Sequence, residues 1–347
     1  MTEEQIMDAL RSVKYPGFSR DIVSFGLVKE IAVEEGETRV QLVLTTNDAA
    51  IPRAIKAEAE EALERAGVEN PKVLIDIHAP AAGVGTSGVG PTNIPGVKNI
   101  VAIASGKGGV GKSTVAANLA VALHKAGARV GLCDCDIYGP SISLMFGSRE
   151  QLMATEENRI LPIEQYGVRL MSMGFLLEDT SPAILRGPMV TRYTQQFLRQ
   201  VEWGELDVLL LDLPPGTGDI QLTIVQTVAL AGAIIVTTPQ EVALIDARKA
   251  ATMFAKVNVP VLGLIENMSY FVSPSDGKRY DIFGSGGGER EAKRLHVPLL
   301  GQVPIDIATR EAGDRGMPIA AEEPESPVGT EFKRIANVLS SYLKAEN

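Results

Sequence analysis

The sequence predicts an α/β protein built on a doubly wound, mainly parallel sheet and preceded by a small α/β domain. Short apolar segments alternate with helical patterns after residue 97, as in parallel sheets that helices cover on both faces. Residues 105–114 read SGKGGVGKST between one such segment and a helical pattern. An uncharged, Gly/Pro-rich stretch at 80–97 has the composition of a linker. These observations predict domains at 1–79 and 98–347.

The first 79 residues predict the order helix, strand, strand, helix, strand. The opening helix includes 7–13, and strands are expected at 25–33 and 38–46, where apolar and polar residues alternate in the second. Ile51, Ile55 and Leu63 then lie on one face of a helix that Gly67 ends. A strand at 72–78 completes a unit of the size of a small independent domain.

The larger part predicts a series of buried strands connected by helices. The apolar segments are 99–105, 129–134, 168–173, 207–213, 233–238, 261–267 and 298–304. Right-handed crossovers between parallel strands give a doubly wound sheet, whose ligands bind at the carboxyl ends of the strands. The last helical pattern, 331–347, places Phe332, Ile335, Leu339 and Leu343 on one face. This face is expected to pack on the protein's own core.

Gly106–Ser113 matches the phosphate-binding pattern G-x-x-x-x-G-K-[ST] between a strand and a helix. Its glycines allow successive backbone N–H groups to surround phosphate oxygens, and the helix start adds a positive dipole end. Lys112 would bridge the terminal phosphates, and the Ser113 hydroxyl would bind Mg²⁺. The predicted nucleotide-binding residues of this loop are Gly106, Lys107, Gly108, Gly109, Val110, Gly111, Lys112, Ser113 and Thr114.

Three aspartates at strand ends are expected at the same edge of the sheet. Asp212 ends the apolar segment 207–213, at the place where a phosphate-loop enzyme needs a carboxylate near its Mg²⁺. Asp134 ends the segment 129–134, and Asp136 comes two residues later. Strand-end aspartates are also common in turns and caps, so their link to the phosphate loop carries the functional interpretation.

The composition favours a soluble cytoplasmic enzyme. Of the 347 residues, 45 % are hydrophobic and 22 % are charged, which is ordinary for a globular enzyme. A net charge of −10 argues against a broad surface for nucleic acid or anionic membranes, so neither partner is expected. The sequence contains no apolar run of the roughly 18 residues that a membrane span needs. Its two cysteines fit a reducing compartment.

The segment KGGVGKST, with its early lysine, resembles the deviant phosphate loop of the MinD/ParA/nitrogenase-iron-protein class of ATPases. In that class the early lysine crosses a dimer interface to reach the nucleotide of the other subunit. The resemblance implies that Lys107 acts across a homodimer, as an internal counterpart of an arginine finger. It therefore implies an ATPase whose activity depends on dimerisation.

Further stretches resemble the Mrp/ApbC branch, the iron–sulfur cluster carrier ATPases. They are 134–141 (DCDIYGPS), 186–189 (RGPM), 212–219 (DLPPGTGD), 266–271 (ENMSYF) and 283–289 (FGSGGGE). Residues 21–31 resemble the iron–sulfur-assembly domain that often precedes such ATPases.

This likeness implies Mg-ATP hydrolysis in iron–sulfur cluster assembly or transfer, with assembly proteins or apoproteins as partners. It also implies that Asn267 contacts the adenine edge while the segment after Val303 packs on the base. Asp136 would orient the attacking water, and Asp134 would support the Mg²⁺ shell.

The chain departs from this family where carriers place a C-x-x-C pair that can hold a [4Fe–4S] cluster across a dimer. Ser273 and Asp276 occupy the cysteine positions, and neither is a normal ligand of a cluster that prefers soft sulfur. No iron–sulfur ligand is therefore identified, and a cluster is implied by resemblance only. Cys133 and Cys135 lie on one face of a predicted strand, where a core role is favoured over metal binding.

Two other functions remain open from the sequence. One is a positioning or scaffold ATPase that binds a partner through nucleotide-gated dimerisation, and a basic patch or tail would favour it. The other is a regulatory binding module with negligible turnover, which measured hydrolysis without a partner would exclude.

Overall fold

The computed structural model describes residues 3–13, 21–23, 27–34, 37–45, 50–68, 71–78, 91–148, 150, 152–153, 155, 159–175, 194–195 and 197–345. Most of the predicted linker, residues 80–90, lies outside this part of the chain, as does the segment 186–189. The chain divides into two compact units, Met1–Val89 and Gly90–Asn347.

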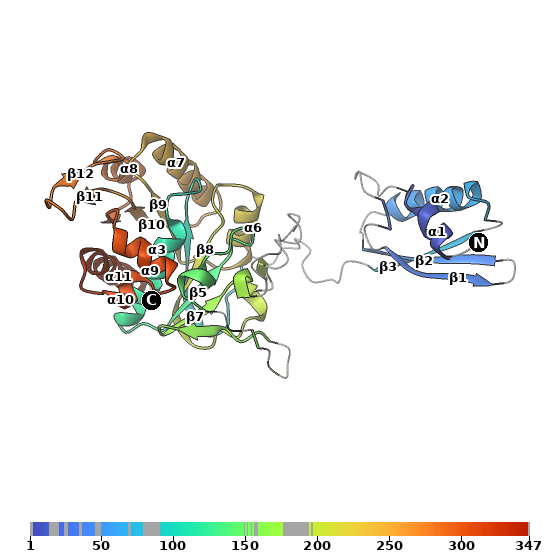
Figure 1. Cartoon of the computed structure of the whole chain (residues 1–347), viewed down its shortest axis with the longest axis horizontal. Helices are drawn as coiled ribbons and strands as arrows, with labels where there is room; N and C mark the ends of the chain where they lie inside the picture. Colours follow the sequence, from blue (N-terminus) through green and yellow to red (C-terminus); the bar gives the residue numbers. More distant parts are fainter. Residues whose placement is uncertain are drawn as a thin grey trace. The chain divides into compact units, whose positions relative to one another are not determined.

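The smaller unit is a three-stranded sheet with two helices on one face (Figure 1). Strands β1 (Val28–Glu34) and β2 (Glu37–Thr45) pair antiparallel, and β2 pairs in parallel with β3 (Lys72–His78). Helices α1 (Glu3–Leu10) and α2 (Ala50–Arg65) supply buried apolar side chains such as Ile6, Leu10 and Leu63. The predicted order of elements is confirmed in this unit.

The larger unit is built on one eight-stranded sheet with the order β13-β10-β9-β4-β8-β5-β7-β6. Its neighbouring strands are parallel except for β6, which pairs antiparallel with β7. The strands are β4 (Val97–Ala104), β5 (Val130–Asp134), β6 (Ile163–Gln165), β7 (Val168–Met171), β8 (Leu206–Asp212), β9 (Gly232–Thr237), β10 (Val261–Glu266) and β13 (Leu299–Gln302).

Helices cover both faces of this sheet (Figure 1). They are α3 (Lys112–Lys125), α4 (Ile142–Met145), η1 (Met173–Phe175), α6 (Asp219–Thr227), α7 (Glu241–Lys256), α8 (Gly287–Leu295), α9 (Ile307–Asp314), α10 (Ile319–Glu322) and α11 (Pro327–Ala345). A small hairpin of β11 (Phe271–Val272) and β12 (Arg279–Tyr280) follows β10.

Two separate hydrophobic cores explain why the central strands are apolar on both of their faces. In β4, Val101 and Ile103 belong to the core that contains α3 and α11, whereas Ala102 and Ala104 belong to the core that contains α6 and α7. Because successive side chains of a strand point to opposite faces, a sheet covered on both sides needs an apolar residue at every position. The predicted doubly wound, mainly parallel fold is confirmed.

The last helix packs on the core as the sequence predicts. Phe332, Ile335, Leu339 and Leu343 of α11 are buried in the core that contains α3. The helix begins at Pro327, four residues before the predicted start at 331. The Ser326 hydroxyl accepts a hydrogen bond from the Gly329 N–H at 3.1 Å, and proline at the first helical position has no N–H to leave unpaired.

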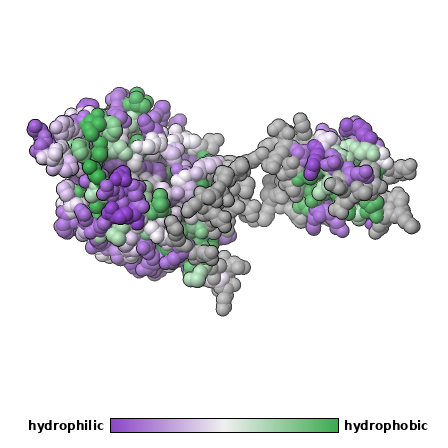
Figure 2. Space-filling model, in the orientation of Figure 1, coloured by the Kyte–Doolittle hydropathy of each residue, from purple (hydrophilic) through white to green (hydrophobic). Residues whose placement is uncertain are grey.

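The antiparallel strand β6 was not predicted. It has three residues and only one, Ile163, is fully buried, so it shows neither a continuous apolar run nor a long alternation. Within the described part of the chain, no helix combines the length and apolar character that crossing a membrane requires. On the face drawn in Figure 2, hydrophobic residues of the larger unit form small groups among hydrophilic ones.

Candidate functional site

The glycine-rich loop connects the end of β4 to the start of α3, as the sequence pattern requires. Gly111 caps α3 in the left-handed region with φ 78°, which side chains other than glycine adopt at a cost. A Cβ on Gly111 would lie 2.2 Å from Asn267 Nδ2, and one on Gly106 would lie 2.1 Å from the Asp246 carbonyl oxygen. Both glycines therefore allow the loop to pack closely against the segments beside it.

Lys112 forms a buried ion pair with Asp212 at the base of this loop. Lys112 is 6 % exposed, Asp212 is fully buried, and the lysine ammonium lies in short contact with Asp212 Oδ1. Burial raises the pKa of Asp212, while the Lys112 charge and hydrogen bonds from Lys112 and Ser113 lower it. The second oxygen, Oδ2, is buried without a hydrogen-bond partner in the described structure.

Asp134 holds the segment that follows β5. Its Oδ2 accepts hydrogen bonds from the N–H groups of Ser141 at 3.0 Å and Ile142 at 3.2 Å, and from the Ser172 hydroxyl at 3.0 Å. Its Oδ1 accepts one from the Asp136 N–H at 3.1 Å. Burial, followed by repulsion from Asp212, raises the pKa of Asp134 to about 7. Asp134 thus fixes the position of the loop that carries Asp136.

The loop lines a cavity of about 220 Å³, to which Asp136 also contributes. Lys107 is half-buried and lines this cavity together with Lys112, Ser113 and Asp136. In the described part of the chain, no carboxylate forms a salt bridge with Lys107. The cavity is also lined by Ser105, Gly108, Gly109, Val110, Gly111, Thr114, Ser141, Met145 and Pro215.

Asn267 follows β10 and reaches the phosphate loop from the other side. Its Nδ2 donates a hydrogen bond to the carbonyl oxygen of Val110 at 2.9 Å. Its own N–H donates to the Thr237 carbonyl oxygen at 2.8 Å. The structure therefore places Asn267 against the backbone of the loop, in addition to the contact with adenine that the resemblance implies.

Sequence reasoning missed the contributions of Ser141 and Ser172. Ser141 lies inside the quoted segment 134–141, and its N–H binds Asp134. Ser172 comes just after β7, and only the parallel pairing of β5 with β7 brings its hydroxyl to Asp134. The pairing of distant strands has no local signal in the sequence.

Ser273 and Asp276 lie on the exposed β11–β12 hairpin, away from the buried acids. The Ser273 hydroxyl is 2.8 Å from that of Ser275, and Asp276 Oδ1 accepts a hydrogen bond from the Lys278 N–H at 3.2 Å. A hydrogen bond from the Ser273 side chain, and then the one from the Lys278 N–H, lower the pKa of Asp276. No group of three or more His, Cys, Asp or Glu side chains within the described ranges could hold a metal ion.

Cys133 and Cys135 are free thiols buried in the core beside α6 and α7. Their sulfur atoms are 3.9 Å apart, and Cys135 Sγ is 3.7 Å from the carbonyl oxygen of Cys133. The hydrogen-bond contact with Cys133, followed by burial, raises the pKa of Cys135, which opposes formation of the thiolate that binds metals. The packing favours the core role expected for these cysteines.

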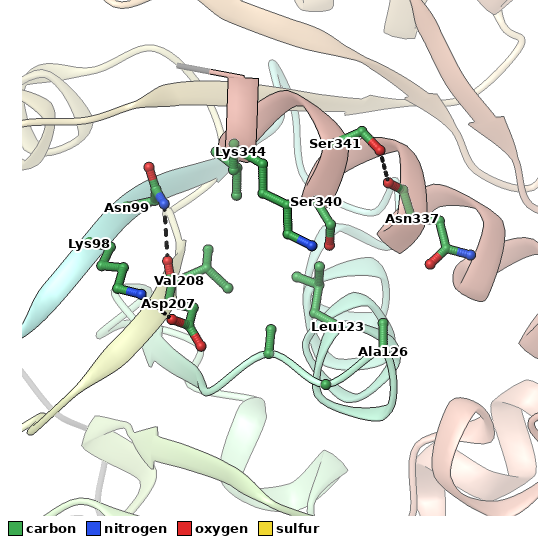
Figure 3. Close-up of a pocket in the computed structure, with 13 residues that line it drawn as sticks. Lys98, Asn99, Leu123, Ala126, Asp207, Val208, Asn337, Ser340, Ser341 and Lys344 are labelled. Atoms are coloured by element: carbon green, nitrogen blue, oxygen red, sulfur yellow. Dashed lines mark hydrogen bonds and ion pairs between the residues drawn. The ribbon is translucent and has the colours of Figure 1, made fainter. Parts of the chain in front are cut away.

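A larger cavity of about 720 Å³ lies at the opposite edge of the sheet, where β4 and β8 begin (Figure 3). Among the described residues that line it, Asp207 is the only carboxylate; it is 2.9 Å from the Lys98 ammonium and also pairs with Arg129. The hydrogen bonds from Arg129 lower the pKa of Asp207. Since the glycine-rich loop does not line this cavity, chemistry rather than size favours the smaller cavity as the candidate phosphate site.

A glycine-rich loop between a strand and a helix, with a buried lysine–aspartate pair at its base, defines a P-loop NTPase. Residues 96–340 match the family model described as the NUBPL iron-transfer P-loop NTPase, and residues 3–77 match the iron–sulfur cluster assembly protein family. The chain belongs to the family of iron-transfer P-loop NTPases. The resemblance stated from the motifs is thereby confirmed.

Similar proteins cover either nearly the whole chain or about three quarters of it. An iron–sulfur cluster carrier protein of Synechocystis is 44 % identical over 99 % of this chain and 98 % of its own length. The iron–sulfur cluster transfer protein NUBPL of Dictyostelium discoideum is 48 % identical over 73 % of this chain and 79 % of its own length.

Solved structures of similar fold cover the larger unit. A nucleotide-binding protein of Archaeoglobus fulgidus in complex with ADP is 40 % identical, with a TM-score of 0.60, and covers 68 % of this chain and 92 % of its own. The cell-division ATPase MinD of Pyrococcus furiosus is 24 % identical with a TM-score of 0.54, covers 70 % of this chain and 99 % of its own, and shares the fold.

Proposed function

We propose that this chain is a homodimeric Mg-ATPase that acts in the assembly of iron–sulfur clusters or their transfer to apoproteins. The observation that carries the proposal is the Lys112–Asp212 ion pair beneath the glycine-rich loop. The names of the similar carrier and transfer proteins support the biological role. The two cysteines are free thiols, which supports a function in the reducing cytoplasm.

The Lys112–Asp212 ion pair suggests that nucleotide binding separates the lysine from the aspartate. Lys112 would turn from Asp212 to the terminal phosphates, since an ammonium beside a triphosphate gains more charge neutralisation than beside one carboxylate. Asp212, with an unpaired buried Oδ2, and the Ser113 hydroxyl are oxygen donors of the kind that Mg²⁺ prefers. Magnesium, when bound, supplies positive charge to the phosphates.

The other predicted residues take their roles around this centre. Asp136 lines the cavity and is proposed to orient the attacking water, with Asp134 holding its loop in place. Asn267 fixes the phosphate loop and is proposed to reach the adenine edge. Lys107 lines the cavity of its own chain, and we propose that it acts on the nucleotide of the partner subunit when two loaded subunits meet.

We also propose that residues 1–79 form an assembly-protein-binding domain, joined by the linker 80–97 to the ATPase domain 98–347. The match of residues 3–77 to an iron–sulfur assembly family supports this division. A cluster held by a C-x-x-C pair is not part of the proposal, because Ser273 and Asp276 occupy those positions. The ATPase cycle would instead serve assembly or transfer partners.

A mixing experiment tests the action of Lys107 across the dimer. Lys107→Ala should reduce ATP hydrolysis about 10³-fold or more while leaving ATP affinity nearly unchanged, and Lys112→Ala should bind ATP poorly. In a mixed dimer, the intact Lys112 site of one chain would receive the intact Lys107 of the other. Mixing the two inactive variants should therefore restore hydrolysis.

Two results would contradict this mechanism. Full turnover by the Lys107→Ala variant would remove the role of the lysine. Mixed dimers that form, as shown by mass spectrometry, but stay inactive would remove its action across the interface. A wild-type protein that binds no ATP would remove the proposed function altogether.

Anaerobic reconstitution with iron and sulfide tests the cluster site. The parent protein is expected to take up no stoichiometric cluster, whereas the Ser273→Cys/Asp276→Cys variant should take one up per dimer. The visible absorbance and the iron and sulfide content measure this directly. A stoichiometric cluster in the parent would show that other groups in the chain hold it.

A further inference from the structure

Glu266, the last residue of β10, is a buried carboxylate that the proposed function does not use. It is 0 % exposed. Its Oε1 accepts hydrogen bonds from the Ser269 hydroxyl at 2.6 Å and from Gln302 Nε2 at 2.8 Å, and its Oε2 accepts one from the Gly288 N–H. No lysine or arginine in the described ranges forms a salt bridge with it. A buried carboxylate without a cation is costly, so these donors must hold it.

The three donors come from three separate segments of the larger unit. Ser269 follows β10, Gln302 ends β13, and Gly288 lies in the first turn of α8, where the helix dipole favours a negative charge. A Cβ on Gly288 would lie 2.8 Å from Glu266 Oε2, so only glycine lets the helix start approach this closely. Glu266 therefore connects β10, β13 and α8 at the carboxyl edge of the sheet.

Backbone contacts tie the same segments to one another. The Val303 N–H donates to the Glu266 carbonyl oxygen, and the Ser269 N–H donates to the Val303 carbonyl oxygen, both at 2.9 Å. The residue after Glu266 is Asn267, which binds the Val110 carbonyl oxygen of the phosphate loop. The segment 266–269 thus places Asn267 against the glycine-rich loop and Glu266 at the ends of β10 and β13.

The arrangement of acids around the loop indicates which part of the nucleotide lies here. Asp212 ends β8 and Asp136 follows β5, both on one side of β4, and they mark the terminal-phosphate end. The ends of β10 and β13 lie on the other side of β4 in the strand order. A nucleotide whose terminal phosphates face Asp212 would extend its nucleoside toward Asn267 and Val303, because ligands of such sheets lie along the carboxyl edge.

We propose that Glu266 is a positioning residue for the nucleoside half of the nucleotide. It fixes the segments at Asn267–Ser269 and Gln302–Val303 on which the base and ribose rest, while the phosphates depend on the loop and Lys112. The inference rests on the proposed binding of ATP. It assigns Glu266 a role that separates nucleoside binding from phosphate binding.

Comparing ATP with inorganic tripolyphosphate tests this separation. In Glu266→Gln, an NH₂ group replaces one acceptor and must face either Gly288 N–H or the Ser269 and Gln302 donors. Loss of a hydrogen bond to a charged group corresponds to about a tenfold or larger change in binding. In calorimetric titrations the variant should therefore bind ATP at least about tenfold more weakly than the wild type. Its affinity for tripolyphosphate should stay within about twofold of the wild-type value, because the phosphate loop is unchanged.

Glu291→Gln provides the matched control. Glu291 on α8 is also a buried glutamate, but Arg248 Nε binds it at 2.8 Å and it has no contact with Gln302 or Ser269 among the described interactions. This variant should bind both ligands as the wild type does. Glu266→Asp withdraws the carboxylate by one methylene and serves as a second test, with the same selective loss for ATP. In hydrolysis assays the KM for ATP should rise while kcat at saturation changes little.

The outcomes separate this inference from the proposed function. Unchanged ATP affinity in both Glu266 variants would overturn the inference. Equal weakening of ATP and tripolyphosphate would also overturn it, because it would show general support of the fold. A wild-type protein that binds tripolyphosphate and ATP equally would indicate that no nucleoside subsite exists, and failure to bind either ligand would instead contradict the proposed function.

Discussion

Replacing Lys112 by methionine should expose the cost of an uncompensated charge inside the larger unit. Methionine keeps most of the side-chain length but leaves Asp212 fully buried without its cation. Removing one partner of a buried ion pair typically costs about 3–5 kcal/mol. We expect a loss of this size in the free energy of unfolding at pH 8.

The pH dependence of this loss has a defined sign. Burial already raises the pKa of Asp212 above its usual value of 3.8, and removal of Lys112 should raise it further. The folded protein then binds a proton that the unfolded chain releases, so stability falls as pH rises above about 4. The cost of Lys112→Met should therefore be smaller at pH 5 than at pH 8.

Urea unfolding followed by tryptophan fluorescence measures both effects. Trp203 is the only tryptophan of the chain and is buried in the larger unit, so it reports on that unit alone. Adding Asp212→Asn to Lys112→Met should recover more than about 2 kcal/mol, because the isolated charge disappears. Lys98→Met serves as the control, since Lys98 and Asp207 are 57 % and 34 % exposed and such pairs contribute about 1 kcal/mol or less.

Two results would refute this reasoning. One is a Lys112→Met variant within about 1 kcal/mol of wild type at pH 8, which would mean that the pair behaves like an exposed one. The other is simple additivity of the two substitutions, which would mean that Lys112 and Asp212 are energetically independent.

Three further predictions follow from the packing around the site. Gly111→Ala forces a Cβ at φ 78° to within 2.2 Å of Asn267 Nδ2. It should lower the free energy of unfolding, measured in urea, by about 2–3 kcal/mol and weaken ATP binding. The control is Gly127→Ala, where φ is 93° but a Cβ meets no atom within 4 Å, so that only the backbone strain should lower the stability. Burial raises the pKa of Asp134 from 3.8 to about 7, so the wild type should lose stability as the pH rises through this range, by up to about 1.4 kcal/mol per pH unit. Asp134→Asn should flatten this pH dependence of the free energy of unfolding. An equal slope in both proteins would contradict the burial argument. Phe332→Ala should cost about 3–5 kcal/mol, because this fully buried ring anchors α11, and a loss below about 1 kcal/mol would mean that the helix is not held there.

The fold was largely readable from local patterns, because strands covered on both faces must be apolar at every position. The central residues of the segments that became β4, β5, β8, β9 and β10 have this property, whereas polar residues such as Lys98 and Asp207 lie near the strand ends. The short strand β6 lacks it. The start of α11 was placed too late because a cap at Ser326 and a proline at 327 precede its apolar face.

Site residues that are neighbours in the sequence could be predicted from local patterns. Contacts that depend on the pairing of distant strands could not. The loop pattern predicted Lys112 and Ser113, and the strand end predicted Asp212, which the structure brings into contact with Lys112. By contrast, the hydrogen bond that the Ser172 hydroxyl donates to Asp134 depends on the position of β7 beside β5. The convergence of three segments on Glu266 likewise depends on the strand order.

The close approach of Gly106 to the backbone of Asp246 has a mechanical consequence. With no side chain between them, the phosphate loop and the first turns of α7 touch main chain to main chain, and neither can move toward the other. Val242 and Ile245 project from the same turns of α7 into solvent. A force applied to that exposed helical surface would reach the loop through the close approach of Gly106 to Asp246.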